Sequence, residues 1–181
     1  KELEKSFFIA GSDRPGPVWI DLPMDVQGAK IPKKDLQKFT IKQEEDALTL
    51  SDDNLKKIYN LVGNSKKPVL WLGHGIRLSG AEKKIKKLIE VLPFPVIVSW
   101  AGMDLLEDSH PLNYGRAGVY GTRAANLIIQ NSDLVISIGN RMSILMIGYE
   151  QSEFARDAKI IQVDIDSLEL EKTEEMVSMS I

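Results

Sequence analysis

Short polar or glycine-containing turns follow the main apolar runs of this sequence, and their residues are suited to binding a ligand. The turns are Gly73-His74-Gly75, Ser99-Trp100-Ala101-Gly102, Gly139-Asn140-Arg141 and Asp164-Ile165-Asp166. The apolar runs before them are typical of strands that are buried on both faces of a parallel sheet. In such a sheet the carboxyl ends of the strands meet at one edge, where α/β proteins bind ligands. The turns together therefore predict a binding site better than any one of them.

The residue types in these turns indicate a phosphate-containing nucleotide. Arg141 can pair with phosphate, and Asp164 can accept hydrogen bonds from ribose hydroxyls. A helix that begins at Gly121-Thr122 offers unpaired N–H groups to an anion. Gly73 and Gly75 match the first two glycines of the dinucleotide fingerprint, but the third is missing. A glycine turn that only joins a strand to a helix explains these two glycines equally well.

No set of residues combines a nucleophile, a base and an orienting group. The sequence has no cysteine and two histidines, His74 and His110, so a zinc site would also need carboxylates. His110 precedes a proline in a loop, where a surface position is expected. Asp104, Glu107 and Asp108 form a small acidic group in the same loop, and loop acids are usually only solvated. We therefore expect a binding function, with no catalytic residue and no metal ligand.

Composition indicates an ordinary soluble protein of 181 residues with a net charge of −3. This charge gives no field that favours nucleic acid or an anionic membrane, and no apolar run is long enough to span a bilayer. The absence of cysteine fits a reducing compartment, and the N-terminal Lys-Glu-Leu-Glu-Lys is no signal peptide. We expect a cytoplasmic protein with neither a nucleic-acid partner nor a membrane partner.

Strands and helices alternate from residue 68 onward, which predicts an α/β fold with a doubly wound, Rossmann-like parallel sheet. A helix over 51–64 is expected to bury an apolar face that includes Tyr59, and a helix over 79–92 is expected to be capped by Ser79. Residues 101–120 are expected to form a long loop. Strands are expected at 69–72, 96–100, 133–138 and 159–163, a further strand at 177–181, and a further helix at 123–131.

The first fifty residues differ in pattern from the rest of the chain. Residues 1–10 are expected to form a helix, and 18–23 a strand, followed by a polar stretch that is typical of a linker. We therefore expect three parts: the tail of a preceding domain (1–27), a linker (28–50) and a central domain (51–181) that is truncated at its C-terminus. The missing initiator Met suggests a fragment of a longer protein.

Several motifs, in the same order, resemble those of thiamine-diphosphate-dependent enzymes of the acetolactate synthase type. The segment from Arg14 to Gln27 resembles the end of their N-terminal pyrimidine-binding domain. From Lys67 onward the chain resembles their central domain. The motifs of this second part are Lys67-Pro68-Val69-Leu70, Gly73-His74-Gly75, Phe94-Pro95-Val96 with Gly102, Gly118-Val119-Tyr120-Gly121, Ala125-Asn126-Leu127, Asn131-Ser132-Asp133-Leu134-Val135, Gly139-Asn140-Arg141 and Val163-Asp164-Ile165-Asp166.

The resemblance implies a central domain of about six strands, of the DHS-like NAD/FAD-binding type, which holds FAD in flavin-containing members. The implied flavin contacts are Gly73, His74, Gly75, Gly118, Val119, Tyr120, Gly121, Gly139, Asn140, Arg141, Asp164 and Ile165. The intact enzyme would be a transferase or lyase that decarboxylates a 2-keto acid and transfers the two-carbon unit. It would act as a homo-oligomer, with thiamine diphosphate and Mg2+ bound outside this chain.

Two other functions remain open. The first is a structural central domain that binds no nucleotide and scaffolds the catalytic domains. It is favoured by Met142-Ser143-Ile144-Leu145, where flavin-binding members often continue with Phe-Asp-Asp-Arg, and by His74, which replaces a glycine. The second is a freestanding NAD-dependent dehydrogenase domain. It is disfavoured because the dinucleotide fingerprint is incomplete and no catalytic partner domain is present.

Overall fold

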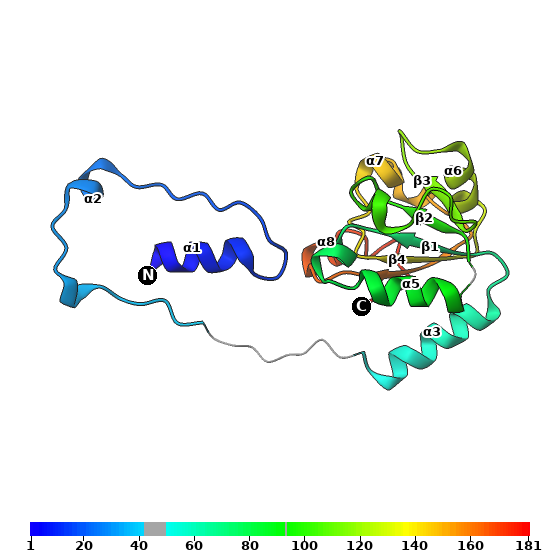
Figure 1. Ribbon diagram of the computed structural model, residues 1–181, viewed down its shortest axis with the longest axis horizontal. Helices are drawn as coiled ribbons and strands as arrows, with labels where there is room; N and C mark the ends of the chain where they lie inside the picture. The colour runs from blue at the N-terminus through cyan, green and yellow to red at the C-terminus, as the bar shows by residue number, and fades with distance from the viewer. Residues whose placement is uncertain (42–49, 93) are drawn as a thin grey trace. The chain divides into compact units, whose positions relative to one another are not determined.

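The computed structural model describes residues 1–41, 50–92 and 94–181, so part of the expected linker, residues 42–49, lies outside the described residues. The chain forms two compact units, Lys1–Thr49 and Leu50–Ile181. The second unit contains the sheet and every strand-end turn considered above (Figure 1).

The first unit contains two short helices, α1 (Glu2–Gly11) and α2 (Met24–Gly28), and the 3-10 helix η1 (Lys33–Asp35). The rings of Phe8 and Phe39 lie 5.6 Å apart, which links α1 to the chain after η1. The expected strand at 18–23 is wrong, because these residues form no strand. A strand exists only when it is hydrogen-bonded to a neighbour, and the described part of this unit contains no other strand.

The second unit is built on a six-stranded sheet in which every adjacent pair is parallel. The strands are β1 (Pro68–Leu72), β2 (Val96–Val98), β3 (Asn113–Arg116), β4 (Leu134–Ile138), β5 (Lys159–Val163) and β6 (Met179–Ser180). Their order across the sheet is β3-β2-β1-β4-β5-β6. The predicted doubly wound α/β fold is therefore confirmed, and the strand order reverses direction between β1 and β4.

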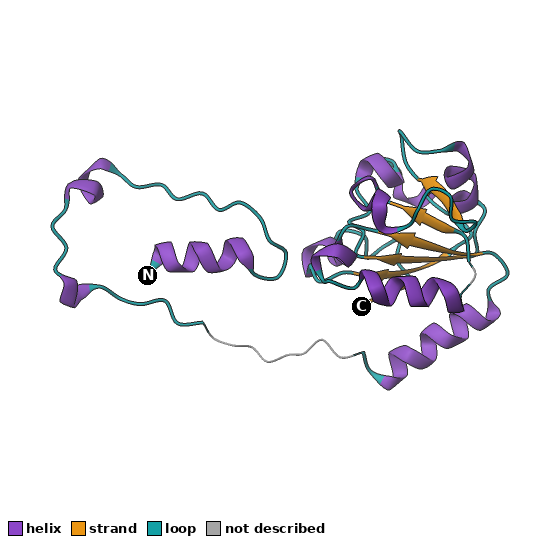
Figure 2. Cartoon of the chain, in the orientation of Figure 1, coloured by secondary structure: helices purple, strands orange, loops and turns teal. Residues whose placement is uncertain are grey.

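Helices cover both faces of this sheet (Figure 2). They are α3 (Asp52–Asn64), α4 (Gly75–Leu78), α5 (Glu82–Val91), α6 (Arg123–Gln130), α7 (Ile144–Ile147) and α8 (Ser167–Glu171), with the 3-10 helices η2 (Trp100–Leu105) and η3 (Gln151–Glu153).

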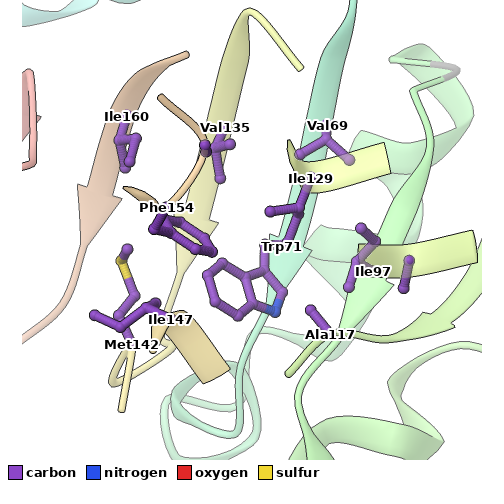
Figure 3. Close-up of a cluster of buried hydrophobic side chains, with 12 residues drawn as sticks. Val69, Trp71, Ile97, Ala117, Ile129, Val135, Met142, Ile147, Phe154 and Ile160 are labelled. Carbon is purple, nitrogen blue, oxygen red and sulfur yellow. The ribbon is translucent and has the colours of Figure 1, made fainter. Parts of the chain in front are cut away.

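Each face of the sheet has its own hydrophobic core, because successive side chains of a strand point to opposite faces. Val69 and Trp71 of β1 lie in one core with residues of α6 and α7, and Leu70 and Leu72 lie in the other with residues of α5. Trp71 packs against Phe154 with ring centroids 5.5 Å apart (Figure 3). Burying a fully enclosed aromatic side chain of this size contributes about 4–6 kcal/mol of transfer free energy.

The helical segments after β1 and before β1 differ from the sequence-based expectation. In place of one helix over 79–92, two helices form, and Gly80 separates them with a φ of +65°. Ser79 is not the N-cap of the helix that runs toward Leu92, a position that Ala81 occupies; Ser79 lies at the C-cap of α4, where its hydroxyl donates to the carbonyl of Ile76 at 3.0 Å. In α3, Ser51 is the N-cap as expected, but Tyr59 is 76% exposed and lies outside the apolar face.

The expected long loop over 101–120 is wrong, since it contains most of η2 and the whole of β3. The sequence of β3, Asn-Tyr-Gly-Arg, has no apolar pattern because this strand lies at the edge of the sheet. Its pairing with β2 is irregular, with a register shift between Val96 and Val98. The expected strand over 96–100 is also shorter than predicted, because Trp100 belongs to η2.

Asp133 links two segments at the amino ends of the strands. It precedes β4 and accepts hydrogen bonds from the Ser65 hydroxyl and from the backbone N–H groups of Lys66 and Lys67, at 2.7 and 2.9 Å for the latter two. Burial opposes ionisation, but these hydrogen bonds outweigh it and hold the pKa of Asp133 below its ordinary value of 3.8. The ionised carboxylate therefore stabilises the segment 65–67, which precedes β1.

We expect Asp133→Asn to lower the free energy of unfolding most at neutral pH. Because the folded-state pKa lies below the unfolded-state value, the contribution of the charge is complete above about pH 4 and is lost as the pH falls through the folded-state pKa. Urea denaturation of wild type and variant between about pH 7 and pH 3 measures this difference.

Asp133 lines a groove beside α3, and Asp157 lines the same groove. Asp157→Asn is therefore the matched control, since Asp157 is an exposed carboxylate there. The control variant is expected to change the free energy of unfolding at neutral pH by less than Asp133→Asn does. A difference for Asp133→Asn that does not shrink with falling pH would contradict the role of its charge.

Candidate functional site

The register of the sheet brings the ends of four strands to one level. Leu72 of β1 pairs with Val98 of β2 and with Ile138 of β4, and Ile138 pairs with Val163 of β5. The residue after each of these positions opens one of the turns described above, so all of these turns begin side by side at the carboxyl edge of the sheet. The edge includes the point between β1 and β4 where the strand order reverses, which is where open α/β sheets bind ligands.

The turns after β1 and β4 are in direct backbone contact. The N–H of Gly75 donates to the carbonyl of Gly139 at 2.9 Å. A Cβ on Gly73 would overlap the Gly139 carbonyl oxygen, and one on Gly75 would lie 2.7 Å from the Cα of Gly139. Gly139 itself has a φ of +58°, which strains other residues. The need for glycine at these positions is therefore explained by the approach of the two turns to each other.

His74 joins the turn after β1 to the turn after β2. Its Nδ1 atom lies 2.9 Å from the carbonyl oxygen of Ala101 in η2. The neighbouring Trp100 packs against Tyr120, with ring centroids 5.1 Å apart, and both rings remain partly exposed. These contacts place Tyr120, in the loop before α6, beside the turn after β2.

The loop from Gly118 to Gly121 is held by the side chain of Asn126 in α6. The amide of Asn126 accepts from the N–H of Gly118 at 2.8 Å and donates to its carbonyl at 3.0 Å. The N–H of Val119 donates to the carbonyl of Leu145 in α7 at 2.9 Å, so this loop also contacts α7. Asn126 was not predicted as a functional residue, although it stands in the Ala125-Asn126-Leu127 motif and is a polar amide in the first turns of an apolar helix.

The turn after β4 presents two polar side chains of contrasting exposure. Asn140 is 2% exposed, and its Nδ2 atom has no hydrogen-bond partner among the residues that the structure describes. A buried amide donor without a partner costs free energy unless a water or ligand satisfies it. The side chain of Arg141 is 62% exposed, although its Nε atom forms an ion pair with Glu169 of α8 at 2.6 Å.

The turn after β5 is organised by two aspartates. Asp164 is partly buried, and its Oδ1 atom accepts from the N–H of Asp166 at 3.1 Å. Asp166 in turn caps α8 by accepting from the N–H of Leu168 at 3.1 Å. Ile165 lies between them and is exposed. One carboxylate oxygen of Asp164 therefore accepts a hydrogen bond within the turn itself.

Two of the candidate acid–base residues in 104–110 have structural partners. Asp104 forms an ion pair with Arg77 at 2.8 Å, and Nδ1 of His110 accepts from the N–H of Leu112 at 3.2 Å. His110 is partly buried in this turn, so the expected surface position is only partly correct. In 1–41, 50–92 and 94–181, no three His, Asp or Glu side chains are placed to share a metal ion.

With the fold and the strand-end residues placed, comparison with known proteins identifies the family. Residues 55–181 match the family described as thiamine pyrophosphate enzyme, central domain. The chain belongs to this family. The central domain therefore has the fold that its sequence motifs implied. Among the described helices, none is long and apolar enough to cross a membrane.

Curated relatives of this central domain are acetolactate synthase large subunits. The chain is 38% identical over 176 residues to the "Probable acetolactate synthase large subunit" of Methanococcus aeolicus, with 94% of the chain and 29% of the relative covered. It is 35% identical over 170 residues to the "Acetolactate synthase isozyme 1 large subunit" of Escherichia coli (strain K12), covering 94% and 29%. The chain thus spans less than a third of the length of these relatives.

Substitution of Gly73 tests the backbone contact between the turns of this central domain. We expect Gly73→Ala to lower the free energy of unfolding by about 3 kcal/mol, because the new Cβ overlaps a backbone carbonyl that no side-chain rotation can move away. Urea denaturation of the variant and wild type gives this difference.

Gly63→Ala is the matched control, because a Cβ on Gly63 in α3 meets nothing within 4 Å. It is expected to stabilise the helix by about 0.5–1 kcal/mol. Equal effects of the two substitutions would show that the turns after β1 and β4 separate without cost.

Proposed function

We propose that this central domain binds FAD, or another nucleotide that contains ADP, at the carboxyl edge of its sheet. The observation that carries the proposal is the turn after β4. It combines the exposed guanidinium of Arg141 with the buried, unpartnered amide of Asn140 beside the glycine contact where the strand order reverses. A cationic donor and a second donor at this position suit an oxyanion such as a diphosphate.

The other predicted contact residues lie on the turns around this point. Arg141 would pair with the diphosphate, Asn140 Nδ2 would donate to a ligand oxygen, and Asp164 would accept from a ribose hydroxyl with its remaining oxygen. FAD is required in flavin-containing acetolactate synthases although the reaction has no net redox change. The full proposed set is Gly73, His74, Gly75, Gly118, Val119, Tyr120, Gly121, Gly139, Asn140, Arg141, Asp164 and Ile165.

The proposal extends to the protein of which this domain forms a part. Similarity to acetolactate synthase large subunits supports an enzyme that decarboxylates a 2-keto acid and transfers the two-carbon unit. Thiamine diphosphate would supply the carbanion chemistry, and this cofactor and Mg2+ would bind outside the residues of this chain. We also propose a cytoplasmic homo-oligomer, in which residues 1–27 complete a preceding pyrimidine-binding domain and 28–50 form a linker.

Binding is tested by titrating the purified protein with FAD, following the quenching of flavin fluorescence, with ADP as a competitor. We expect saturable quenching that ADP reverses. Arg141→Ala should weaken binding of both ligands about 10- to 100-fold, since a charge-assisted hydrogen bond contributes about 1.5–3 kcal/mol.

Arg156→Ala is the control for this titration. Arg156 is equally exposed and pairs with Glu153 at 3.3 Å, but it precedes β5 and so belongs to the opposite edge of the sheet. It should leave both affinities unchanged. Absence of FAD and ADP binding, in this chain and in the full-length protein alike, would support a scaffolding domain instead.

A further inference from the structure

One nearly buried carboxylate connects the turn after β4 to α8, the helix that follows the turn after β5. The side chain of Glu169 in α8 is 9% exposed. Its Oε1 atom pairs with Nε of Arg141 at 2.6 Å, and its Oε2 atom pairs with the ammonium group of Lys172. Lys172 also donates to the backbone carbonyl of Arg141 at 3.1 Å. Arg141 is therefore fixed at two points, its guanidinium and its backbone.

The geometry of this cluster differs from that of a surface ion pair. Water screens an exposed ion pair, which therefore restrains its side chains only weakly. A buried carboxylate, in contrast, needs partners for both oxygens to offset the free energy of its desolvation. Glu169 meets that condition with two cations, and the cluster keeps a net charge of +1. Arg141 nevertheless stays 62% exposed, so its guanidinium retains surface that a ligand can reach.

We propose that Glu169 is a positioning residue that holds Arg141 at the strand edge, ready to bind the diphosphate of a nucleoside diphosphate. The inference rests on the proposed nucleotide-binding function and adds a residue to it. A free arginine side chain loses rotamer freedom when it binds, and an arginine that is already held loses less. The benefit of Glu169 is therefore confined to ligands that contact Arg141.

Charge alone predicts the opposite effect. Removing Glu169 raises the net charge of the cluster from +1 to +2, which favours any anion nearby. If Glu169 only neutralised Arg141, its loss would tighten the binding of ADP. If it positions Arg141, its loss weakens ADP binding despite the added positive charge. The sign of the change separates the two roles.

The test compares ADP with adenosine, which lacks phosphate, by calorimetric titration of wild type, Glu169→Gln, Glu169→Ala, Arg141→Ala and the double variant Arg141→Ala/Glu169→Ala. We expect Glu169→Ala to weaken ADP binding about three- to tenfold and to leave adenosine binding unchanged. Glu169→Gln, which keeps the shape and one acceptor, should fall between wild type and Glu169→Ala. In the Arg141→Ala background the loss of Glu169 should no longer weaken ADP binding.

Glu153→Ala is the matched control, since Glu153 pairs with Arg156 away from this edge and should not change either affinity. Thermal unfolding of each variant checks the fold, and Glu169→Gln replaces Glu169→Ala if the latter unfolds. Unchanged or tighter ADP binding in a folded Glu169 variant, with Arg141→Ala still defective, would overturn the positioning role and leave the proposed function standing. A wild-type protein that binds neither ADP nor FAD would overturn both.

Discussion

The contact between the backbones of Gly73, Gly75 and Gly139 is the constraint on which the carboxyl edge of the sheet depends. It sits between β1 and β4, where the chain leaves the two strands toward opposite halves of the sheet. Side chains at these positions would push the two turns apart. With glycine, the two turns stay in contact. This contact fixes the position of His74, in one turn, relative to Asn140 and Arg141 in the other.

Hydrogen bonds from side chains extend this constraint to the other turns. His74 contacts a carbonyl of η2, and Asn126 binds the loop before α6. Glu169 of α8 pairs with Arg141 in the turn after β4. His74 lies in a turn, Asn126 in α6 and Glu169 in α8, so none of these side chains belongs to a strand. The edge is thus held by a small number of polar contacts that are added to a sheet whose stability comes from its two apolar cores.

The sequence predicted the central strands well, because a run such as Val69–Leu72, buried on both faces, has few alternatives to a parallel strand. It failed where structure depends on distant partners. β3 has the sequence Asn-Tyr-Gly-Arg, without an apolar pattern. The segment 18–23 has strand-like residues, but the described residues of its unit offer no strand to pair with. The expected N-cap role of Ser79 was also wrong. The sequence shows a hydroxyl near a helix start, but only the backbone of the turn decides which residue caps the helix. At the strand edge the turns were predictable from glycine and charge, whereas Glu169 carried no local signal and the motif that contains Asn126 did not reveal which loop its side chain holds.

The irregular register between β2 and β3 has a consequence for the edge of the sheet that β3 forms. A regular edge strand exposes a row of N–H and C=O groups that can pair with a strand of another molecule. Here the outer strand is four residues long, shifts its register and contains Gly115 with a φ of +91°. Such an edge is a poor template for continuing the ladder. Pairing with a strand of another molecule is therefore disfavoured at this edge of the sheet.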